Sequence, residues 1–256
     1  MKLARSYVEK PWGRGRLPHM FDAPQNVRTG EVWFTGGGDV PLLAKYIFTS
    51  ERLSIQVHPD DEQARARGLP RGKSECWYIL DAEAGAVIGL GLTHEASKDE
   101  LRSAALDGSI EQLMDWRPVA AGDFLFVPAG TIHAIGAGIS LLEFQQNSDV
   151  TYRLYDYGRP RELHLDDAVG VASRRGYPVG LAQHVGANDD RTLVERPFLL
   201  VHTRHDALSA RRRWVLPLDG EVQSRDDIAA AGECLLLGPG EPLESDGARM
   251  LIGATA

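Results

Sequence analysis

The sequence has little of what several classes of protein require. Its 256 residues include two cysteines, Cys76 and Cys234, which is too few for a disulfide framework and typical of a reducing compartment. The 36 acidic residues outnumber the 28 basic ones, and the net charge of −8 argues against a nucleic-acid-binding surface. The sequence has no apolar run of the ~18–20 residues that cross a bilayer, and its first residues contain no apolar signal-peptide core. These absences predict a cytoplasmic protein with no membrane or nucleic-acid partner.

The sequence is dominated by short apolar segments. They are rich in β-branched or aromatic residues and are bounded by Gly, Pro or Asp. They predict β-strands at residues 41–50, 53–57, 75–80, 86–92, 124–127, 139–145, 150–156, 198–203, 213–216 and 234–237. This spacing is typical of a sandwich or barrel and not of alternating βαβ units.

Few helices are expected. Ser97 and Glu100 form a capping box that predicts a helix to about Leu106. Ser109 is expected to cap a second helix that runs through Trp116. Residues 60–67 predict an acid-first helical turn that ends at Gly68. These helices would decorate a β core.

A weak internal repeat links residues 122–130 (GDFLFVPAG) with residues 232–240 (GECLLLGPG). Both segments predict a turn with an acidic residue, an apolar strand and a second turn, although chance similarity between two glycine-rich hairpins is an alternative. His133 follows the first segment, and no histidine follows the second. We therefore expect one module at residues 1–167 that carries a site and a degenerate module at residues 168–256.

Alternation in residues 53–59 (LSIQVHP) places Ser54, Gln56 and His58 on one face of a strand and apolar side chains on the other. Polar side chains that face a protein interior need partners, and a metal ion would satisfy Gln56 and His58 together. Taken alone, this segment is better explained as a strand with one wet face.

Residues 122–133 match the second motif of cupin proteins at every defined position, with Pro128 and Gly130 in the turn and His133 after it. A histidine at this place in a matched motif is more often a ligand than a structural residue. Glu75 opens the next strand along from His58. Gln56, His58, Glu75 and His133 would offer two nitrogens and two oxygens, a set that suits Zn²⁺ and leaves a position for water or substrate. Fe²⁺, Mn²⁺ and Co²⁺ fit the same spacing.

Four motifs together resemble the cupin-type mannose-6-phosphate isomerases, especially their short bacterial forms, over roughly the first two-thirds of the chain. They are SIQVHP at 54–59, KSE at 73–75, PAGTIH at 128–133 and the interval from Glu143 to Arg153. Gln56 in place of a histidine and the long interval before Glu75 are typical of these isomerases and argue against dioxygenase cupins.

The resemblance implies an all-β fold: a cupin (jelly-roll type) β-barrel with a few helices and a second, degenerate cupin-like module. It also implies one zinc ion held by the four residues named above. Lys73 and Glu143 would transfer protons, and Arg153 would be catalytic or would bind the phosphate, although a Glu143–Arg153 ion pair between neighbouring strands is an alternative. Ser54, Lys73, Arg153 and Trp12 would contact the substrate.

The resulting hypothesis is a metal-dependent isomerase that interconverts mannose 6-phosphate and fructose 6-phosphate by proton transfer through an enediol. A non-catalytic sugar-phosphate sensor and a metal-dependent oxygenase remain as alternatives, and the oligomeric state stays open. Measurement of turnover, of ligand-induced stabilisation without product, and of O₂ consumption would separate the three.

Overall fold

The computed structural model describes residues 1–24 and 26–256. The chain forms two compact units, here called unit 1 (Met1–Tyr46 and Val185–Ala256) and unit 2 (Ile47–His184). The N-terminal segment therefore belongs to the same unit as the C-terminal one. The division expected from the repeat, between residues 167 and 168, stays a prediction, because a compact unit need not be contiguous in sequence.

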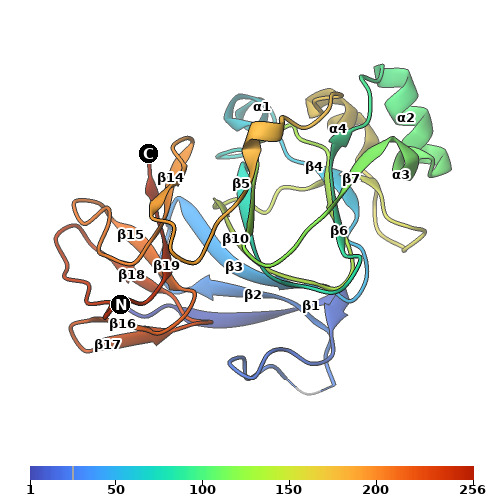
Figure 1. Ribbon diagram of the computed structural model, residues 1–256. Helices are drawn as coiled ribbons and strands as arrows, with labels where there is room; N and C mark the ends of the chain where they lie inside the picture. Colours follow the sequence, from blue (N-terminus) through green and yellow to red (C-terminus); the bar gives the residue numbers. More distant parts are fainter. Residues whose placement is uncertain (25) are drawn as a thin grey trace. The chain divides into compact units, whose positions relative to one another are not determined.

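Unit 2 is built from two antiparallel sheets and a few short helices (Figure 1). One sheet contains, in spatial order, β10 (Ile139–Gln146), β5 (Glu75–Ala82), β8 (Asp123–Val127) and β12 (Ala182–His184). The other contains β11 (Tyr152–Tyr155), β4 (Ile55–Val57), β9 (His133–Ile135), β6 (Val87–Leu92) and β7 (Met114–Pro118). The strands form two sheets and not one continuously closed barrel, which is the arrangement of a jelly roll.

The helices of unit 2 are α1 (Asp61–Arg65), α2 (Lys98–Asp107), α3 (Ile110–Leu113) and α4 (Leu165–Val171), with a 3₁₀ turn η1 at Val179–Leu181. The helices α2, α3 and α4 lie on the side of β4, β6 and β7 (Figure 1). Ile55 and Val57 of β4 are fully buried in one cluster with Leu101 of α2 and Ala168 of α4. This core takes up the apolar face of β4, so the polar face of the strand points the other way.

Unit 1 contains two groups of strands and a hairpin. β1 (Ala4–Arg14) pairs with β2 (Thr29–Thr35), and β3 spans Leu42–Phe48. A five-stranded sheet has the order β13 (Arg191–Val194), β14 (Phe198–Thr203), β19 (Met250–Thr255), β15 (Arg213–Pro217) and β18 (Leu235–Leu237). β16 (Glu221–Ser224) and β17 (Asp227–Ala230) form the hairpin. Buried apolar side chains of the five-stranded sheet and of the hairpin make the core.

The two repeated segments share one backbone geometry. Gly122 and Gly232, which begin them, have φ of 91° and 90°, and Gly130 and Gly240, which end them, have φ of 86° and 72°. Left-handed backbone of this kind favours glycine. The strands between these turns are β8 and β18. The resemblance between the two segments therefore reflects the same turn, strand and turn.

All ten expected strands are present; five are shorter than expected by one to three residues, and four are longer by one or two. The Ser97 capping box is confirmed, because Ser97 accepts from the Glu100 backbone and Glu100 reaches back to Ser97. The helix expected through Trp116 is wrong: α3 ends at Leu113, Ser109 makes no side-chain cap, and the following residues form β7. Pairing with β6, where Trp116 lies opposite Gly89, overrides the local helical pattern.

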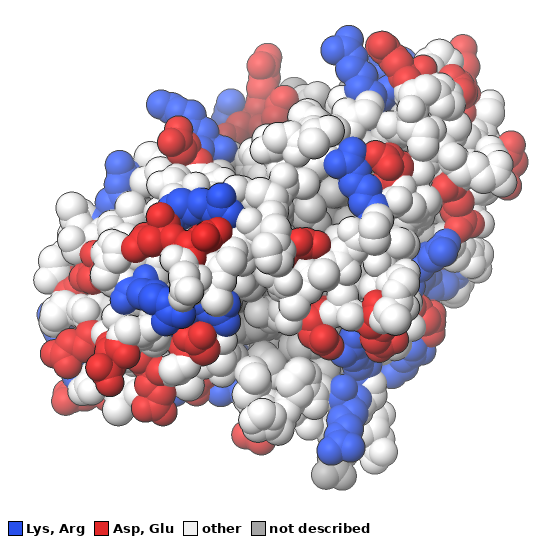
Figure 2. All heavy atoms as spheres, in the orientation of Figure 1, with Lys and Arg blue, Asp and Glu red and all other residues white. Residues whose placement is uncertain are grey.

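Within the described part of the chain, no helix is both long enough and apolar enough to cross a membrane. Figure 2 shows basic and acidic side chains interspersed over the face in view.

Ser97 and Ser109 provide a matched test of helix capping. Ser97→Ala should lower the free energy of unfolding by about 1 kcal/mol, because it leaves a backbone N–H at the start of α2 without its acceptor. Ser109→Ala should change it by less than about 0.5 kcal/mol, since no cap is lost. Urea unfolding of the three proteins measures both values, and equal losses would contradict the assignment.

Candidate metal and substrate site

The polar face of β4 lines the candidate site, as the alternation of the sequence predicts. Ser54 and His58 are 2% and 1% exposed, while Ile55 and Val57 lie in the helix-side core at 0%. Ser54 Oγ donates to Gln56 Oε1 at 3.2 Å. The wet-face explanation is therefore wrong for this strand, because Ser54 and His58 are buried.

The turn before β9 brings His133 to β4. Gly130 N donates to the His58 carbonyl at 2.8 Å, and His133 lies directly opposite Gln56 in the strand register. His133 Nδ1 is 2.9 Å from the carbonyl oxygen of Thr131. If Nδ1 carries the proton, this hydrogen bond orients the ring and leaves Nε2 with a lone pair for ligation, as in many metal-binding histidines.

Glu75 comes from the other sheet and completes a compact cluster. Its Oε1 is 3.3 Å from His133 Nε2, and its Oε2 is 3.5 Å from His58 Nε2. One ligand atom from each of these three residues lies within 4.8 Å of the others. Each residue is 1% exposed. Residues far apart in sequence therefore converge between the two sheets of unit 2, as expected.

The donor set fits a divalent metal ion. Both ring nitrogens of His58 are buried and lack a hydrogen-bond partner among the described residues, an arrangement that is costly unless another group binds there. Gln56 lies beside the cluster, with Nε2 at 3.2 Å from His133 Nε2. Ligation through Gln56 Oε1 requires a 180° rotation of the terminal amide, which occupies nearly the same space.

The protonation states also favour ligation. Burial, and then Lys73, lower the pKa of His58 to about 3, and burial also lowers the pKa of His133. Both imidazoles are therefore neutral near pH 7 and have lone pairs to offer. Burial opposes ionisation of Glu75, but the charge of Lys73 holds the pKa of this carboxyl well below its usual value. The cluster thus combines two neutral nitrogens with one carboxylate.

A tight loop places Lys73 next to the cluster. Its Nζ is 3.1 Å from Glu75 Oε2, and its side chain is 6% exposed. Lys73 N donates to the Pro59 carbonyl at 3.0 Å, and Gly72 N donates to Asp61 Oδ1 at 2.8 Å. A Cβ at Gly72 would lie 2.4 Å from the Asp60 carbonyl carbon, so this close return of the loop needs glycine. Lys73 is therefore a buried amine and not a surface loop residue.

Glu143 is held by an indole that was not expected in the site. Trp77 Nε1 donates to Glu143 Oε2 at 3.0 Å, and the Trp77 ring meets the His133 ring edge to face at 5.4 Å. β10 pairs with β5, whereas β11 lies in the other sheet. An ion pair between neighbouring strands is therefore not the arrangement of Glu143 and Arg153. The sequence gives one sign of this role: Trp77 comes two residues after Glu75, so both side chains lie on the same face of the strand.

Arg153 lies directly opposite Gln56 in the pairing of β11 with β4. Its neighbours Tyr152 and Leu154 are buried in the helix-side core, so its side chain takes the same face as Gln56. Arg153 Nε is buried and has no hydrogen-bond partner among residues 1–24 and 26–256. Burial, and then Arg161, lower the pKa of Arg153. Such a guanidinium is suited to an anion.

Trp12, expected to contact substrate, lies in β1 of unit 1 and is 3% exposed. Its contribution to the site stays a prediction.

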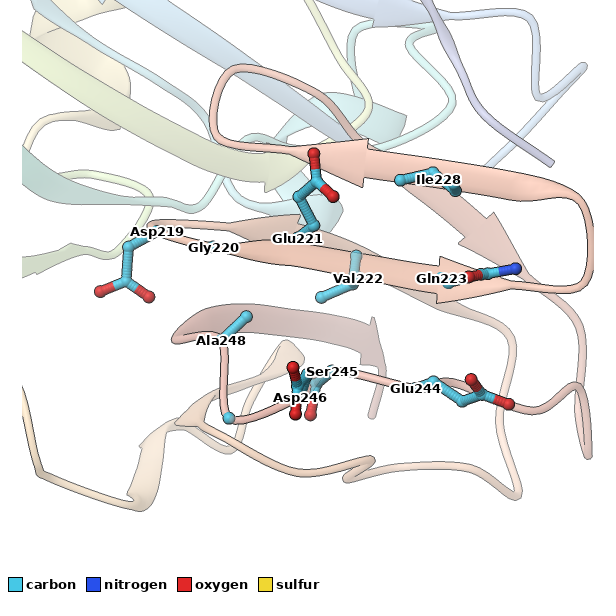
Figure 3. Close-up of a pocket in the computed structure, with 11 residues that line it drawn as sticks. Asp219, Gly220, Glu221, Val222, Gln223, Ile228, Glu244, Ser245, Asp246 and Ala248 are labelled. Carbon is cyan, nitrogen blue, oxygen red and sulfur yellow. The ribbon is translucent and has the colours of Figure 1, made fainter.

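Unit 1 also contains a surface groove of about 490 Å³, beside the β16–β17 hairpin (Figure 3). Four carboxylates lie along it, those of Asp219, Glu221, Glu244 and Asp246. No Lys or Arg is among its lining residues, so it is unsuited to a phosphate monoester.

Comparison of sequences supports the resemblance indicated by the motifs. The chain is 48% identical to mannose-6-phosphate isomerase of Streptococcus mutans over 188 residues, which cover 69% of this chain and 58% of that protein. It is 42% identical to mannose-6-phosphate isomerase ManA of Bacillus subtilis over 176 residues, or 64% of this chain and 55% of the relative. The matched region spans little more than half the length of these relatives. No protein-family model matches.

Comparison of structures gives the fold of the whole chain. The crystal structure of mannose 6-phosphate isomerase from Bacillus subtilis aligns with a TM-score of 0.79 and 27% identity, covering 98% of both chains. A putative mannosephosphate isomerase from Archaeoglobus fulgidus aligns with a TM-score of 0.80 over 99% of this chain and 96% of that one, at 14% identity. The fold is thus the cupin fold of phosphomannose isomerases. The resemblance of the sequence to mannose-6-phosphate isomerases is confirmed.

The buried histidines predict how stability of the metal-free protein depends on pH. The pKa of His58 is about 3 in the folded state against 6.5 for an ordinary histidine, so between these values the unfolded chain binds more protons. Stability should be full above about pH 6.5 and fall below it, by up to about 1.4 kcal/mol per pH unit for each such histidine. The carboxyl of Glu75 adds a loss only below its usual pKa of 4.5.

Urea unfolding with a chelator present, at about pH 7.5 and about pH 5, measures this loss. His58→Gln, which cannot titrate, should lose less stability over the same interval, and groups far from the cluster contribute equally to both proteins. An equal loss in both proteins would show that His58 is not a buried neutral imidazole.

Proposed function

We propose that this chain is a divalent-metal-dependent mannose-6-phosphate isomerase that interconverts mannose 6-phosphate and fructose 6-phosphate by proton transfer through an enediol. The observation that carries the proposal is the buried cluster of His58, Glu75 and His133 with the Lys73 amine 3.1 Å from Glu75. A structural cluster would need neither a neutral imidazole with two unsatisfied nitrogens, as in His58, nor a buried amine beside it. The substrate is proposed from the names of the related isomerases.

His58, Glu75 and His133, with Gln56 through its carbonyl oxygen, would hold the metal, and zinc is the ion we propose. When bound, the ion supplies a Lewis acid for the sugar oxygens, worth several kcal/mol. Two nitrogens and two oxygens suit zinc, and three or four protein ligands leave room for a substrate oxygen.

Lys73 and Glu143 are the proposed proton-transfer groups. Aldose–ketose isomerisation moves one proton between adjacent carbons and another between their oxygens, so it needs groups that can exchange protons on one side of the sugar. The Lys73 amine touches a proposed metal ligand, and Trp77 holds one oxygen of Glu143 in a fixed direction. Both residues are nearly excluded from water, at 5% and 2% exposure, which limits proton exchange with solvent.

Arg153 is proposed to bind negative charge on the substrate. Its Nε is buried and without a hydrogen-bond partner in the described chain, and a phosphate or a developing oxyanion would satisfy it. Ser54, which donates to Gln56, is proposed to contact the phosphate end. All of these roles refer to a single bound hexose phosphate. The cytoplasmic location stays a prediction, and the oligomeric state stays open.

A coupled assay with metal analysis tests the proposal. Native protein should contain about one divalent ion per chain, convert mannose 6-phosphate to fructose 6-phosphate, and lose activity with EDTA. His133→Ala should lose metal and turnover together. His94→Ala is the matched control, because His94 is exposed and contacts Glu100 and Thr93, which lie outside the cluster; it should retain both. Metal-loaded native protein that turns over no hexose phosphate would contradict an isomerase, and ligand-induced stabilisation without product would favour the sensor.

A second variant separates proton transfer from metal binding. Lys73→Met removes the amine but keeps an unbranched side chain one atom shorter and all proposed ligands, so we expect retained metal and a kcat lower by about 10²–10⁴-fold. Lys98→Met, at an exposed position of α2, should behave as native. Steady-state kinetics with metal content measured on the same samples provide the test. A near-native kcat for Lys73→Met would remove Lys73 from the mechanism.

A further inference from the structure

The amide of Gln145 is held in one orientation. Its Nε2 donates to two backbone carbonyls, those of Gln146 at 2.8 Å and Ser148 at 2.7 Å. Rotating the amide by 180° would set its oxygen against both carbonyl oxygens, so the positions of nitrogen and oxygen are fixed. Gln145 therefore presents an acceptor and cannot present a donor.

That acceptor is buried and unused by the protein. Gln145 is 1% exposed, and its Oε1 lacks a hydrogen-bond partner among the residues that the structure describes. Leaving a buried carbonyl oxygen unsatisfied is unfavourable, and buried polar groups in native proteins nearly always have a partner. A donor from outside the chain is the remaining way to satisfy it.

The strand register directs this oxygen to the metal side of the sheet. Gln145 lies directly opposite Glu75 in the pairing of β10 with β5, and directly opposed residues project from the same face. Glu143 is two positions earlier on β10 and shares that face. The acceptor is thus beside a proposed metal ligand, on the face that carries Glu143.

The next residue shows how a structural glutamine in this strand behaves. Gln146 is half-buried and projects from the opposite face, and its amide is satisfied at both ends. Its Oε1 accepts from Ser74 N at 2.9 Å, and its Nε2 donates to Asp61 at 3.0 Å. The two adjacent glutamines therefore differ. Gln145, which faces the cluster, has an acceptor oxygen that no described residue uses, whereas the acceptor oxygen of Gln146 is bonded.

We infer that Gln145 Oε1 is a substrate-binding acceptor that receives a hydrogen bond from one hydroxyl group of the hexose phosphate. The inference rests on the proposed function for the identity of the ligand. A fixed acceptor binds a hydroxyl and discriminates against a carbonyl or phosphate oxygen at the same place. A sugar phosphate that lacks this hydroxyl leaves the oxygen buried and unsatisfied, which is the situation that gives strong discrimination.

A binding cycle between protein and ligand tests this role. The probes are mannitol 6-phosphate, which has no carbonyl and cannot be isomerised, and its derivatives that each lack one hydroxyl. Calorimetry on the metal-loaded protein should show one hydroxyl whose removal weakens binding to native protein by about tenfold or more. In Gln145→Met the same removal should have little effect, while the other hydroxyl deletions should act equally on both proteins.

Gln146→Met is the matched control, because it removes the same amide one residue away, on the other face. It should show the native pattern of hydroxyl dependence. If Gln145→Met does not fold with its metal, Gln145→Asn takes its place: it keeps an amide but is one methylene shorter, so removal of that one hydroxyl should cost less than in native protein. Equal penalties for every hydroxyl in native protein and in the folded Gln145 variant would overturn the inference.

The outcome is separable from the proposed function. Turnover of mannose 6-phosphate by native protein is measured on the same preparation. If native protein turns over mannose 6-phosphate but no hydroxyl deletion depends on Gln145, the oxygen binds only water. The inference about Gln145 is then wrong, and the proposed function is unaffected. Absence of both turnover and hexitol-phosphate binding is failure of the proposed function.

Discussion

The site depends on keeping the carboxylate of Glu75 ionised in the interior of unit 2. At 1% exposure, an isolated carboxylate would be costly and would take up a proton. The ammonium of Lys73, 3.1 Å from Glu75 Oε2, stabilises this charge. Two backbone contacts hold the side chains in place. Lys73 N donates to the Pro59 carbonyl, and Gly130 N, in the turn before His133, donates to the His58 carbonyl. The same carboxylate then provides the negative charge that a divalent cation needs.

The repeated turn has a different partner in unit 1. There the turn after β18 is bound by Arg213, which is 0% exposed and donates to the Gly238 and Glu241 carbonyls at 3.1 and 2.6 Å. Asp206 pairs with the same guanidinium at 3.0 Å. In unit 2 the corresponding turn precedes His133 and the candidate metal cluster. The turn in unit 1 is thus held by the guanidinium of Arg213, whereas the turn in unit 2 leads to the candidate metal cluster.

Much of the candidate site could be predicted from sequence because its residues lie at strand-defined positions. Alternation in residues 53–59 fixed the face of His58, and the matched turn indicated His133. The roles of Trp77 and Gln145 could not be predicted, because they depend on which strands pair: only the β10–β5 register sets Trp77 against Glu143 and Gln145 against Glu75. β7 was mistaken for helix for the same reason, since its pairing with β6 is non-local.

The central claim is that Gln56, His58, Glu75 and His133 bind one divalent cation. Anomalous X-ray diffraction from crystals of metal-loaded protein, recorded on both sides of the metal absorption edge, tests it most directly. The account predicts one anomalous peak per chain, within about 2.0–2.2 Å of both histidine nitrogens and the carboxylate oxygen, with the Gln56 amide oxygen turned toward it. A peak elsewhere in the chain, or none at this cluster, would contradict it.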